Sequence, residues 1–327
     1  MQATSEAQYA AALGDHAPDL EKVRDGLWSL GMPMPIVQPH FTLSYLVRDD
    51  DGGIHLVDPG WDSDENWQRL VDALEEVGSA TEQVRSVVVT HLHPDHLGMA
   101  ERVREKTGAR VALHRVEQEG IHELRQGESP ESASARFTQW GAPLDVHGEL
   151  VEAANRRNAW KPFTADLLLD DGDVLDIPGW ELEVLHTPGH TTGHLALVDA
   201  SKKLLLTGDL LLPSQFPGIG LGGTSITNPI DDYLASIHRI AEFGNYEVLP
   251  GHGYRFTGLS ERCAVTAAHH DQRTGEVRTA LTARPESTVW EIAAGLTWTA
   301  GWENLRGLEL LSALAQTATH LDRVVAG

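Results

Sequence analysis

The sequence feature that most constrains this chain is a run of ligand-type side chains at residues 91–96, which reads His-Leu-His-Pro-Asp-His. Residues 86–90, directly before it, are rich in apolar β-branched side chains, a composition typical of a buried strand. Histidine and aspartate are both common metal ligands. Four such side chains within six residues therefore follow the end of a predicted strand.

The spacing of these side chains predicts that they serve two sites. Alternate residues of an extended chain point to the same side, so His91 and His93 can present two imidazoles to one cation. Pro94 interrupts the strand, which lets Asp95 and His96 turn toward a neighbouring point. One short segment is therefore expected to supply ligands to two neighbouring cations.

The same arrangement recurs further along the chain. In each case an apolar, strand-like segment runs into a glycine or proline turn and then into a ligand-type side chain. The strand-like segments are 182–186, 203–207 and 247–249, and the ligand-type residues that follow them are His190, Asp209 and His252. We expect the ends of several strands to meet at one cleft, where glycine allows the backbone to turn sharply beside the metals.

With these residues in this order, the sequence resembles the metallo-β-lactamase superfamily, in its hydrolase branch close to glyoxalase II. The resemblance covers roughly residues 20–257. It implies an α/β fold, a four-layer αββα sandwich, that holds a dinuclear metal site. The resemblance places His91, His93 and His190 on the first metal, Asp95, His96 and His252 on the second, and Asp209 as a bridge between the two.

The chemistry of these side chains agrees with that assignment. Imidazoles and carboxylates without thiolates suit zinc, and also iron or manganese. Two divalent metal ions that share a carboxylate would also share a hydroxide, and we expect this metal-bridged hydroxide to be the nucleophile of a hydrolase. Asp95 and Asp209 are the expected catalytic carboxylates. Asp209 would bridge the metals, and Asp95 would orient the hydroxide and pass a proton.

Other polar residues near the motif are predicted to support the ligands. By the resemblance, Asp58 orients metal ligands and binds no metal itself. His186 and His194 flank the ligand His190, and we interpret them as hydrogen-bonding or packing residues because the ligand set is already complete. His114 ends a predicted strand and matches no ligand position, so we expect a structural or cavity-edge role for it.

The charge of the chain bears on its partners. The sequence has 48 Asp and Glu residues against 25 Lys and Arg residues, a formal net charge of -23. Such acidity repels phosphate backbones at long range and disfavours a general nucleic-acid-binding role. A cleft that holds two divalent metals could still accept a local anion. We therefore expect a small-molecule substrate.

Cysteine content and hydropathy indicate the compartment. The single cysteine, Cys263, excludes an intramolecular disulfide. Residues 1–20 have polar residues throughout and lack an apolar core of signal-peptide length, and no later run approaches the length of a membrane span. We predict a cytoplasmic protein with no membrane partner.

The length of 327 residues exceeds one typical domain. We predict a catalytic domain at 1–257, interrupted by a helical insertion over the cleft at 115–165, and a C-terminal helical module at 258–327. The module resembles the helical or winged-helix-like additions of this hydrolase branch. Because its acidic residues slightly outnumber its basic ones, we expect it to pack against the catalytic domain or a second copy in a homodimer, and not on DNA.

Several apolar residues are candidates for the walls of the cleft. One group precedes the first predicted hairpin and another lies in the insertion; they are Met32, Met34, Ile36 and Phe41, and Phe137, Trp140, Trp160 and Phe163. The alternative is that the first group seals the core and the second anchors the insertion. The glycine-rich segment 216–223 lacks the ending of a phosphate loop and is predicted to be an apolar loop beside the metals.

These features favour hydrolysis of a thioester or carboxylic ester with an apolar acyl part. Lactonases of this superfamily commonly carry a tyrosine three residues after the bridging aspartate, where this chain has Leu212. That difference weakens a lactonase, although Tyr254 is a candidate replacement. A phosphodiesterase or ribonuclease would use the same metals, and an iron-dependent sulfur dioxygenase shares much of the motif, so both remain alternatives.

Overall fold

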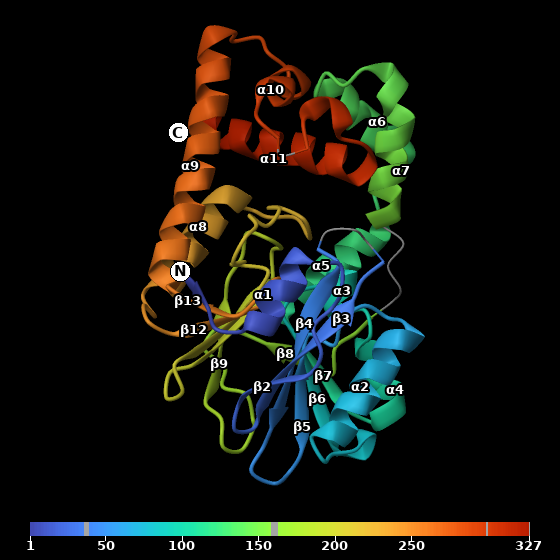
Figure 1. Cartoon of the computed structure of the whole chain (residues 1–327). Coiled ribbons are helices and arrows are strands. Elements are labelled where there is room, and N and C mark those ends of the chain that lie inside the picture. Colours follow the sequence, from blue (N-terminus) through green and yellow to red (C-terminus); the bar gives the residue numbers. More distant parts are fainter. Residues whose placement is uncertain (36–38, 158–162, 299, 327) are drawn as a thin grey trace.

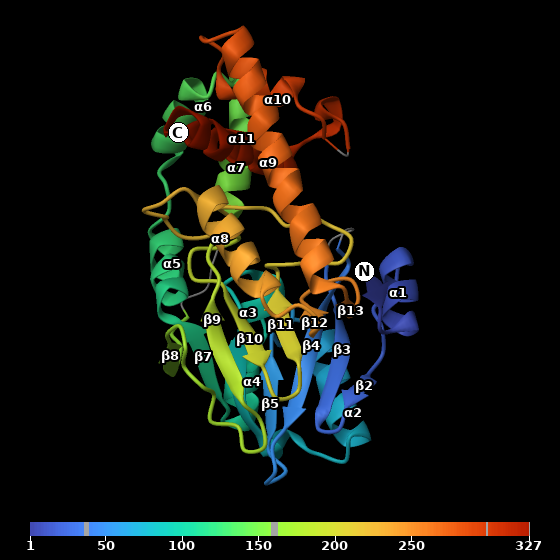
Figure 2. The same cartoon turned by 90° about the vertical axis from the view of Figure 1, so that its left-hand side faces the viewer.

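The computed structural model shows a sandwich of β-sheets with helices on both outer faces and a helical cap at one end (Figures 1 and 2). It describes residues 1–35, 39–157, 163–298 and 300–326. Within these ranges the strands form two sheets, and the layers follow the order helix, sheet, sheet, helix. The predicted αββα architecture is therefore confirmed.

Each sheet is built mostly from one half of the sandwich sequence: β2 to β8 form one sheet, and β9 to β13 with β1 form the other. One sheet has the spatial order β1 (Gln2–Ala3), β13 (Phe256–Thr257), β12 (Glu247–Pro250), β11 (Leu204–Gly208), β10 (Leu195–Asp199), β9 (Leu182–His186). The other has the order β2 (Glu21–Arg24), β3 (Leu27–Pro33), β4 (Phe41–Arg48), β5 (Ile54–Val57), β6 (Val84–Val89), β7 (Arg110–His114), β8 (Leu167–Leu169). Strands β5 to β8 run parallel, so their connections must cross over the outer face.

The strands are apolar on both sides because each sheet is covered on both faces. In β11, Leu204 and Leu206 lie in the core between the sheets, while Leu205 faces the outer helices. In β4, Leu43 lies between the sheets and Leu46 faces the opposite outer layer. This alternation with a period of two follows from strand geometry.

Amphipathic helices form the outer layers. The helices α2 (Asp64–Glu76) and α4 (Ala100–Thr107) pack on the β2 to β8 sheet, and α8 (Pro229–Ala241) and the start of α9 (Leu259–Ala283) pack on the other sheet. The side chain of Ser63 caps α2 by accepting the Asn66 N–H at 3.0 Å. Further helices, α1 (Glu6–Leu13) and α5 (Arg115–Gln126), lie beside the sandwich.

The helical cap is built from two segments that are far apart in sequence. Helices α6 (Pro130–Gln139) and α7 (His147–Arg157) of the insertion share one apolar core with α10 (Val289–Gly295) and α11 (Gly307–Ala326). Helix α9 runs from the sandwich up to the cap (Figure 1). The predicted helices of the C-terminal region are confirmed, whereas the domain boundary at residue 257 stays a prediction. Among the described residues, no helix has the length and apolar character needed to cross a bilayer.

Candidate metal centre

The ligand-type residues lie at the ends of strands, beneath the cap. The segment with His91 and His93 follows β6, and α3 (Pro94–Leu97) then begins with Pro94 as its first residue. Proline suits this position because it has no backbone N–H to leave unpaired. Asp95 and His96 therefore lie on a helical turn and point away from the preceding extended chain, as the sequence predicts.

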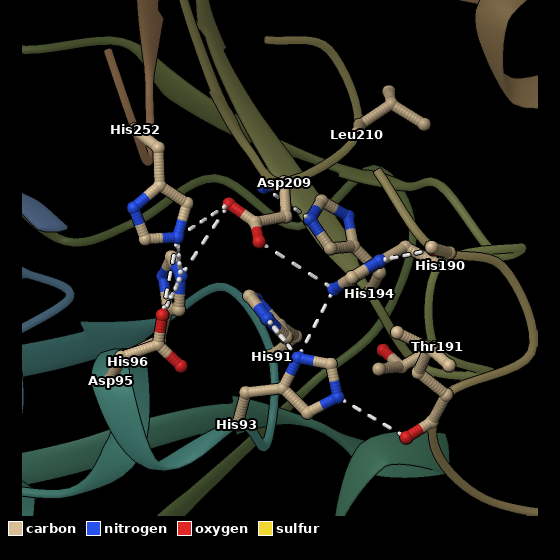
Figure 3. A network of polar contacts seen from close by, with 12 residues as sticks. His91, His93, Asp95, His96, His190, Thr191, His194, Asp209, Leu210 and His252 are labelled. Carbon is tan, nitrogen blue, oxygen red and sulfur yellow. Dashed lines mark hydrogen bonds and ion pairs between the residues drawn. The ribbon is translucent and has the colours of Figure 1, made fainter. Parts of the chain in front are cut away.

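Three other strands bring the remaining residues to the same place. His190 follows β9, Asp209 follows β11 and His252 follows β12. Figure 3 shows that these three side chains and those of the 91–96 segment point toward one another. All seven candidate ligands therefore converge in space, although they are spread over about 160 residues of sequence.

The first cluster consists of three histidines. The Nδ1 atom of His93 lies 3.0 Å from His91 Nε2 and 3.1 Å from His190 Nε2. The ligand atoms of all three residues lie within 4.8 Å of one another, which is close enough for one ion to contact all of them.

The second cluster consists of Asp95, His96 and His252. An Asp95 carboxylate oxygen lies 3.1 Å from His252 Nε2 and 3.4 Å from His96 Nε2. Asp209 lies between the two clusters, with one oxygen 3.4 Å from both His96 Nε2 and His252 Nε2 and the other 3.6 Å from His190 Nε2. Its position is the one that a bridging carboxylate would need.

Hydrogen bonds fix which nitrogen of each imidazole carries a proton. The outward nitrogen of each ring faces an oxygen that can only accept, or whose own hydrogen is already donated elsewhere. These pairs are His91 Nδ1 with Thr90 Oγ1 (3.0 Å), His93 Nε2 with Leu221 O (3.1 Å), His96 Nδ1 with Asp58 Oδ2 (2.8 Å), His190 Nδ1 with Gly218 O (2.6 Å) and His252 Nδ1 with Phe41 O (2.7 Å). In the neutral form each inward nitrogen therefore carries a lone pair.

The first cluster is a set of three neutral imidazoles that suits a cation. Burial, with neighbouring histidines, lowers the pKa of His91 well below its usual value, and burial lowers the pKa of His93 to about 3. The pKa of His190 is also lowered, chiefly by burial. The three rings are neutral at pH 7, so their lone pairs face one another at hydrogen-bond distance with no proton between them. A divalent metal ion fits this donor set.

The second cluster differs from the first because it includes a carboxylate, that of Asp95, and lies beside Asp209. Burial alone would lower the pKa of His252, but Asp209 and Asp95 raise it to about 10. The negative charge of these carboxylates therefore favours a positive charge on the imidazoles, which either protons or a bound cation can supply. The Oδ1 atom of Asp209 is buried and has no hydrogen-bond partner among the described residues, which also fits a metal ligand. Metal binding here would release protons.

A ring of hydrogen bonds holds the ligands in place. Asp58 accepts the Thr90 N–H at 2.7 Å, the Thr90 hydroxyl at 2.7 Å and the His96 Nδ1–H at 2.8 Å. His194 Nε2 accepts the backbone N–H of Asp209 at 3.2 Å. Both residues therefore lie where a supporting role requires. His114 and His186 stack on each other, with ring centroids 4.1 Å apart, and belong to neither cluster.

Close approach of the backbone explains the glycine beside His252. A Cβ atom on Gly251 would lie 2.6 Å from Asp209 Oδ1 and 2.7 Å from His96 Cε1. Any larger side chain would therefore displace two candidate ligands. Glycine is needed at this position for space and not for a positive φ angle.

A cavity of about 680 Å³ opens over the clusters. Its floor carries His93, Asp95, His190, Asp209 and His252. Its walls are mostly apolar and include Met34, Trp61, Leu124, Leu212, Phe216 and Leu221. Helices α7 and α11 of the cap also contribute, through Ala153 and Leu308. None of the described residues that line the cavity is a lysine or an arginine.

Comparison with known proteins identifies the family. A sequence profile of the Metallo-beta-lactamase superfamily matches residues 37–252, which contain every candidate ligand. The chain belongs to the metallo-beta-lactamase superfamily. Its fold and its histidine and aspartate clusters agree with a metal-dependent hydrolase of this superfamily.

Relatives of this metallo-beta-lactamase superfamily hydrolase include proteins with assigned names. "Probable metallo-hydrolase YqjP" of Bacillus subtilis is 27% identical over 85% of this chain and 86% of its own length. "Hydroxyacylglutathione hydrolase GloC" of Haemophilus influenzae is 28% identical over 60% of this chain and 75% of its own length. "Acyl-coenzyme A thioesterase MBLAC2" of Gallus gallus is 28% identical over 58% of this chain and 62% of its own length.

A solved structure extends the similarity to the cap. The metallo-beta-lactamase family protein TTHA1429 from Thermus thermophilus superposes with a TM-score of 0.77 and 30% sequence identity. The match covers 93% of this chain and 95% of that one. The likeness therefore includes the helices beyond residue 257, which the family profile does not reach.

Glu117 is a buried residue of the site that the sequence pattern missed. Its carboxylate accepts the Leu92 N–H at 2.7 Å, the Thr191 hydroxyl at 2.7 Å and the Gly193 N–H at 2.8 Å. It therefore ties the segment with His91 and His93 to the loop that follows His190. Burial raises the pKa of Glu117 to about 7. A glutamate in a helix with no ligand spacing gives no signal of this role in a single sequence.

Only some of the predicted wall residues reach the cavity. Met34 lines it, whereas Met32 and Phe41 are buried in the cores of the sandwich. The alternative, that these residues seal the core, is therefore right for Met32 and Phe41. Ile36 lies outside the described residues.

The aromatic residues of the insertion anchor it and do not line the cavity. Phe137 is fully buried in the cap core, Trp140 packs against that core, and Phe163 packs against the sandwich. The alternative, that these residues anchor the insertion, is therefore right for all three, since they pack in or against apolar cores and are not among the described residues that line the cavity. Trp160 lies outside the described residues.

The loops near Asp209 behave as the sequence indicates. Phe216, Gly218 and Leu221 of the glycine-rich segment line the cavity beside the ligands, as does Leu212. Tyr254 does not line it, because its ring packs against Tyr9 with centroids 5.0 Å apart. Tyr254 therefore does not replace the tyrosine that lactonases carry at the position of Leu212.

Proposed function

We propose that this chain is a dinuclear metallo-hydrolase that cleaves thioesters with an apolar acyl group. The observation that carries the proposal is the apolar cavity that opens directly over the two ligand clusters. The similarity to a hydroxyacylglutathione hydrolase and to an acyl-coenzyme A thioesterase supports the same bond type. The absence of lysine and arginine from the described cavity walls disfavours a phosphodiester substrate.

In this proposal the clusters hold two divalent metal ions, with zinc as the first choice. His91, His93 and His190 would hold one ion, Asp95, His96 and His252 the other, and Asp209 would touch both. When bound, such ions act as Lewis acids that lower the pKa of water and polarise a carbonyl group. The catalytic region would comprise residues 1–257 with its insertion, and residues 258–327 would form the helical module.

The side chains of the chain would carry out the remaining steps. The walls formed by Trp61, Leu212 and Phe216 would hold the acyl group and exclude water from it. Asp95 lines the cavity floor, and its carboxylate would accept a proton from the attacking water and return it to the leaving thiolate. Asp58 and His194 would keep the ligands His96 and Asp209 oriented.

Thiol release from a ladder of acyl-thioesters tests the proposal. Zinc-reconstituted protein should release thiol with a maximum at one acyl length, because the cavity has a limited volume of about 680 Å³ and apolar walls. Asp209→Ala should lose this activity, since it removes the carboxylate between the clusters. Thiol release no faster than that of Asp209→Ala, from every thioester, would contradict the proposal.

A further inference from the structure

Part of the cavity wall next to Asp209 is a loop whose main-chain carbonyl groups are bonded by a residue of another segment. Residues 212–218 run from Leu212 to Gly218, contain two prolines, and form part of the cavity wall. A prolyl nitrogen cannot donate a hydrogen bond. Among the described backbone hydrogen bonds of turns and loops, none is donated by residues 212–218. The carbonyl groups of Leu212 and Gln215 are paired from outside the loop.

Arg262 of helix α9 supplies these donors. Its Nε donates to Leu212 O at 2.7 Å, and its Nη2 donates to Gln215 O at 2.5 Å. The residue is 8% exposed, and burial lowers its pKa. A planar guanidinium can make both bonds at once, which a lysine could not do in the same geometry. A buried charge is thus used to hold two main-chain carbonyls of the cavity wall.

Phe216 is held from the same helix. The guanidinium of Arg262 lies 4.8 Å from the centroid of its ring, and the imidazole of His269 stacks on it with centroids 3.9 Å apart and an angle of 1° between the planes. Arg262 and His269 are seven residues apart, about two helical turns, so they face the same side of α9. The ring of Phe216 is 39% exposed and lines the cavity.

The same loop also touches the first ligand cluster. The carbonyl oxygen of Gly218 accepts the Nδ1–H of His190 at 2.6 Å. The path from α9 to the metal centre is therefore short: Arg262 holds the loop, the loop presents Phe216 to the cavity, and two residues later it orients His190.

We propose that Arg262 and His269 are positioning residues that place Phe216 and thereby determine which acyl groups the cavity accepts. The inference rests on the proposed thioesterase function of the same cavity. A shift of one aromatic wall by about a methylene's width changes discrimination between neighbouring acyl lengths by roughly tenfold or more. Helix α9 would therefore set the specificity of a site whose candidate ligands all precede it in the sequence.

The test compares variants of α9 on the thioester ladder. Arg262→Met keeps an unbranched apolar stem but removes both donors and the cation, and His269→Ala removes only the stacking partner from a half-buried position. We expect each variant to change the ratio of kcat/KM for the longest and shortest acyl groups by about tenfold, mainly through KM. Arg278→Met, on an exposed turn of the same helix, should leave the ratio unchanged.

Amide hydrogen exchange provides a readout that needs no substrate. The amides of Gly220 and Leu221 directly follow the loop and donate to Gly189 O and His190 O at 2.8 Å, so hydrogen bonds protect them in the parent protein. These two amides should exchange at least about tenfold faster in Arg262→Met than in the parent protein or in Arg278→Met. An acyl ratio within about twofold of the parent value, in variants that remain folded, would overturn the proposal, and so would unchanged exchange of these two amides. If the parent protein released no thiol at all, the proposed function would fail, and the exchange rates would still decide whether Arg262 holds the loop.

Discussion

Replacing Asp58 with asparagine should move the proton of the candidate ligand His96 from one ring nitrogen to the other. The Asp58 carboxylate accepts three hydrogen bonds, from the N–H and hydroxyl of Thr90 and from His96 Nδ1–H. In Asp58→Asn the amide oxygen can still accept the Thr90 N–H, but the amide NH2 then faces His96 Nδ1. Two donors cannot pair, so His96 must move its proton to Nε2, which is the nitrogen that faces Asp95 and Asp209.

The size of the effect follows from the second cluster. An imidazole with a proton on its inward nitrogen, Nε2, cannot bind a metal through that nitrogen. To bind a metal, His96 must therefore return the proton to Nδ1 and lose the hydrogen bond from the introduced amide. Loss of such an outer partner typically costs 10- to 100-fold in metal affinity, or about 1.4–2.7 kcal/mol. The cluster of His91, His93 and His190 should be affected less, since none of its rings touches Asp58.

Zinc titration against a chromophoric chelator would measure both dissociation constants. Asp49→Asn is a matched control, because Asp49 also pairs with a buried histidine, His55, at 3.0 Å, but at the opposite end of β5. It should lower the melting temperature and leave both zinc affinities unchanged. The reasoning would be refuted if Asp58→Asn bound both ions within twofold of the parent protein, or if the control lost as much affinity.

Two further substitutions test the supporting structure. Because the pKa of Glu117 is raised from 4.5 to about 7 in the folded state, its contribution to stability is present below about pH 4.5 and is lost as the pH rises through 7. That difference corresponds to about 3 kcal/mol. In urea denaturation of chelator-treated protein, Glu117→Gln should therefore gain about 3 kcal/mol relative to the parent between pH 4.5 and pH 8.5; a difference that is constant with pH would contradict the assignment. Phe137→Ala should destabilise the cap by about 3–5 kcal/mol, because the ring is fully buried in its core. Phe137→Ala should bind zinc with the same affinities as the parent protein. A loss of zinc binding would show that Phe137 does more than anchor the insertion.

The candidate ligands could be predicted because their pattern is local. Each lies within a few residues of a strand end, and the turn residues between are visible in the sequence. The role of Asp58, which directly follows β5, was predicted from the resemblance to the family. Glu117 was not, because its three partners come from two other segments and its burial is known only from the fold.

The errors have a shared physical cause. The group around Met32 was a candidate for the cleft wall, but β3 continues to Pro33 and pairs with β4 up to Phe41. Met32 lies within β3 and is buried in the core, whereas Met34 lies just beyond the end of the strand and reaches the cavity. For Phe137, the decisive neighbours lie about 150 residues later in the chain. Non-local packing of this kind leaves no pattern in a single sequence.

The shared core of the cap also has a consequence for the order of folding during synthesis. Helix α7 ends at Arg157, and α11 begins about 150 residues later at Gly307. At about 5–20 residues per second, the apolar faces of α6 and α7 leave the ribosome roughly 8–30 s before α11, which covers them. The sandwich can be nearly complete while the roof of its cavity is still unfinished. Nascent chains of this protein should therefore be most prone to aggregation and to chaperone capture in that interval, until α11 emerges.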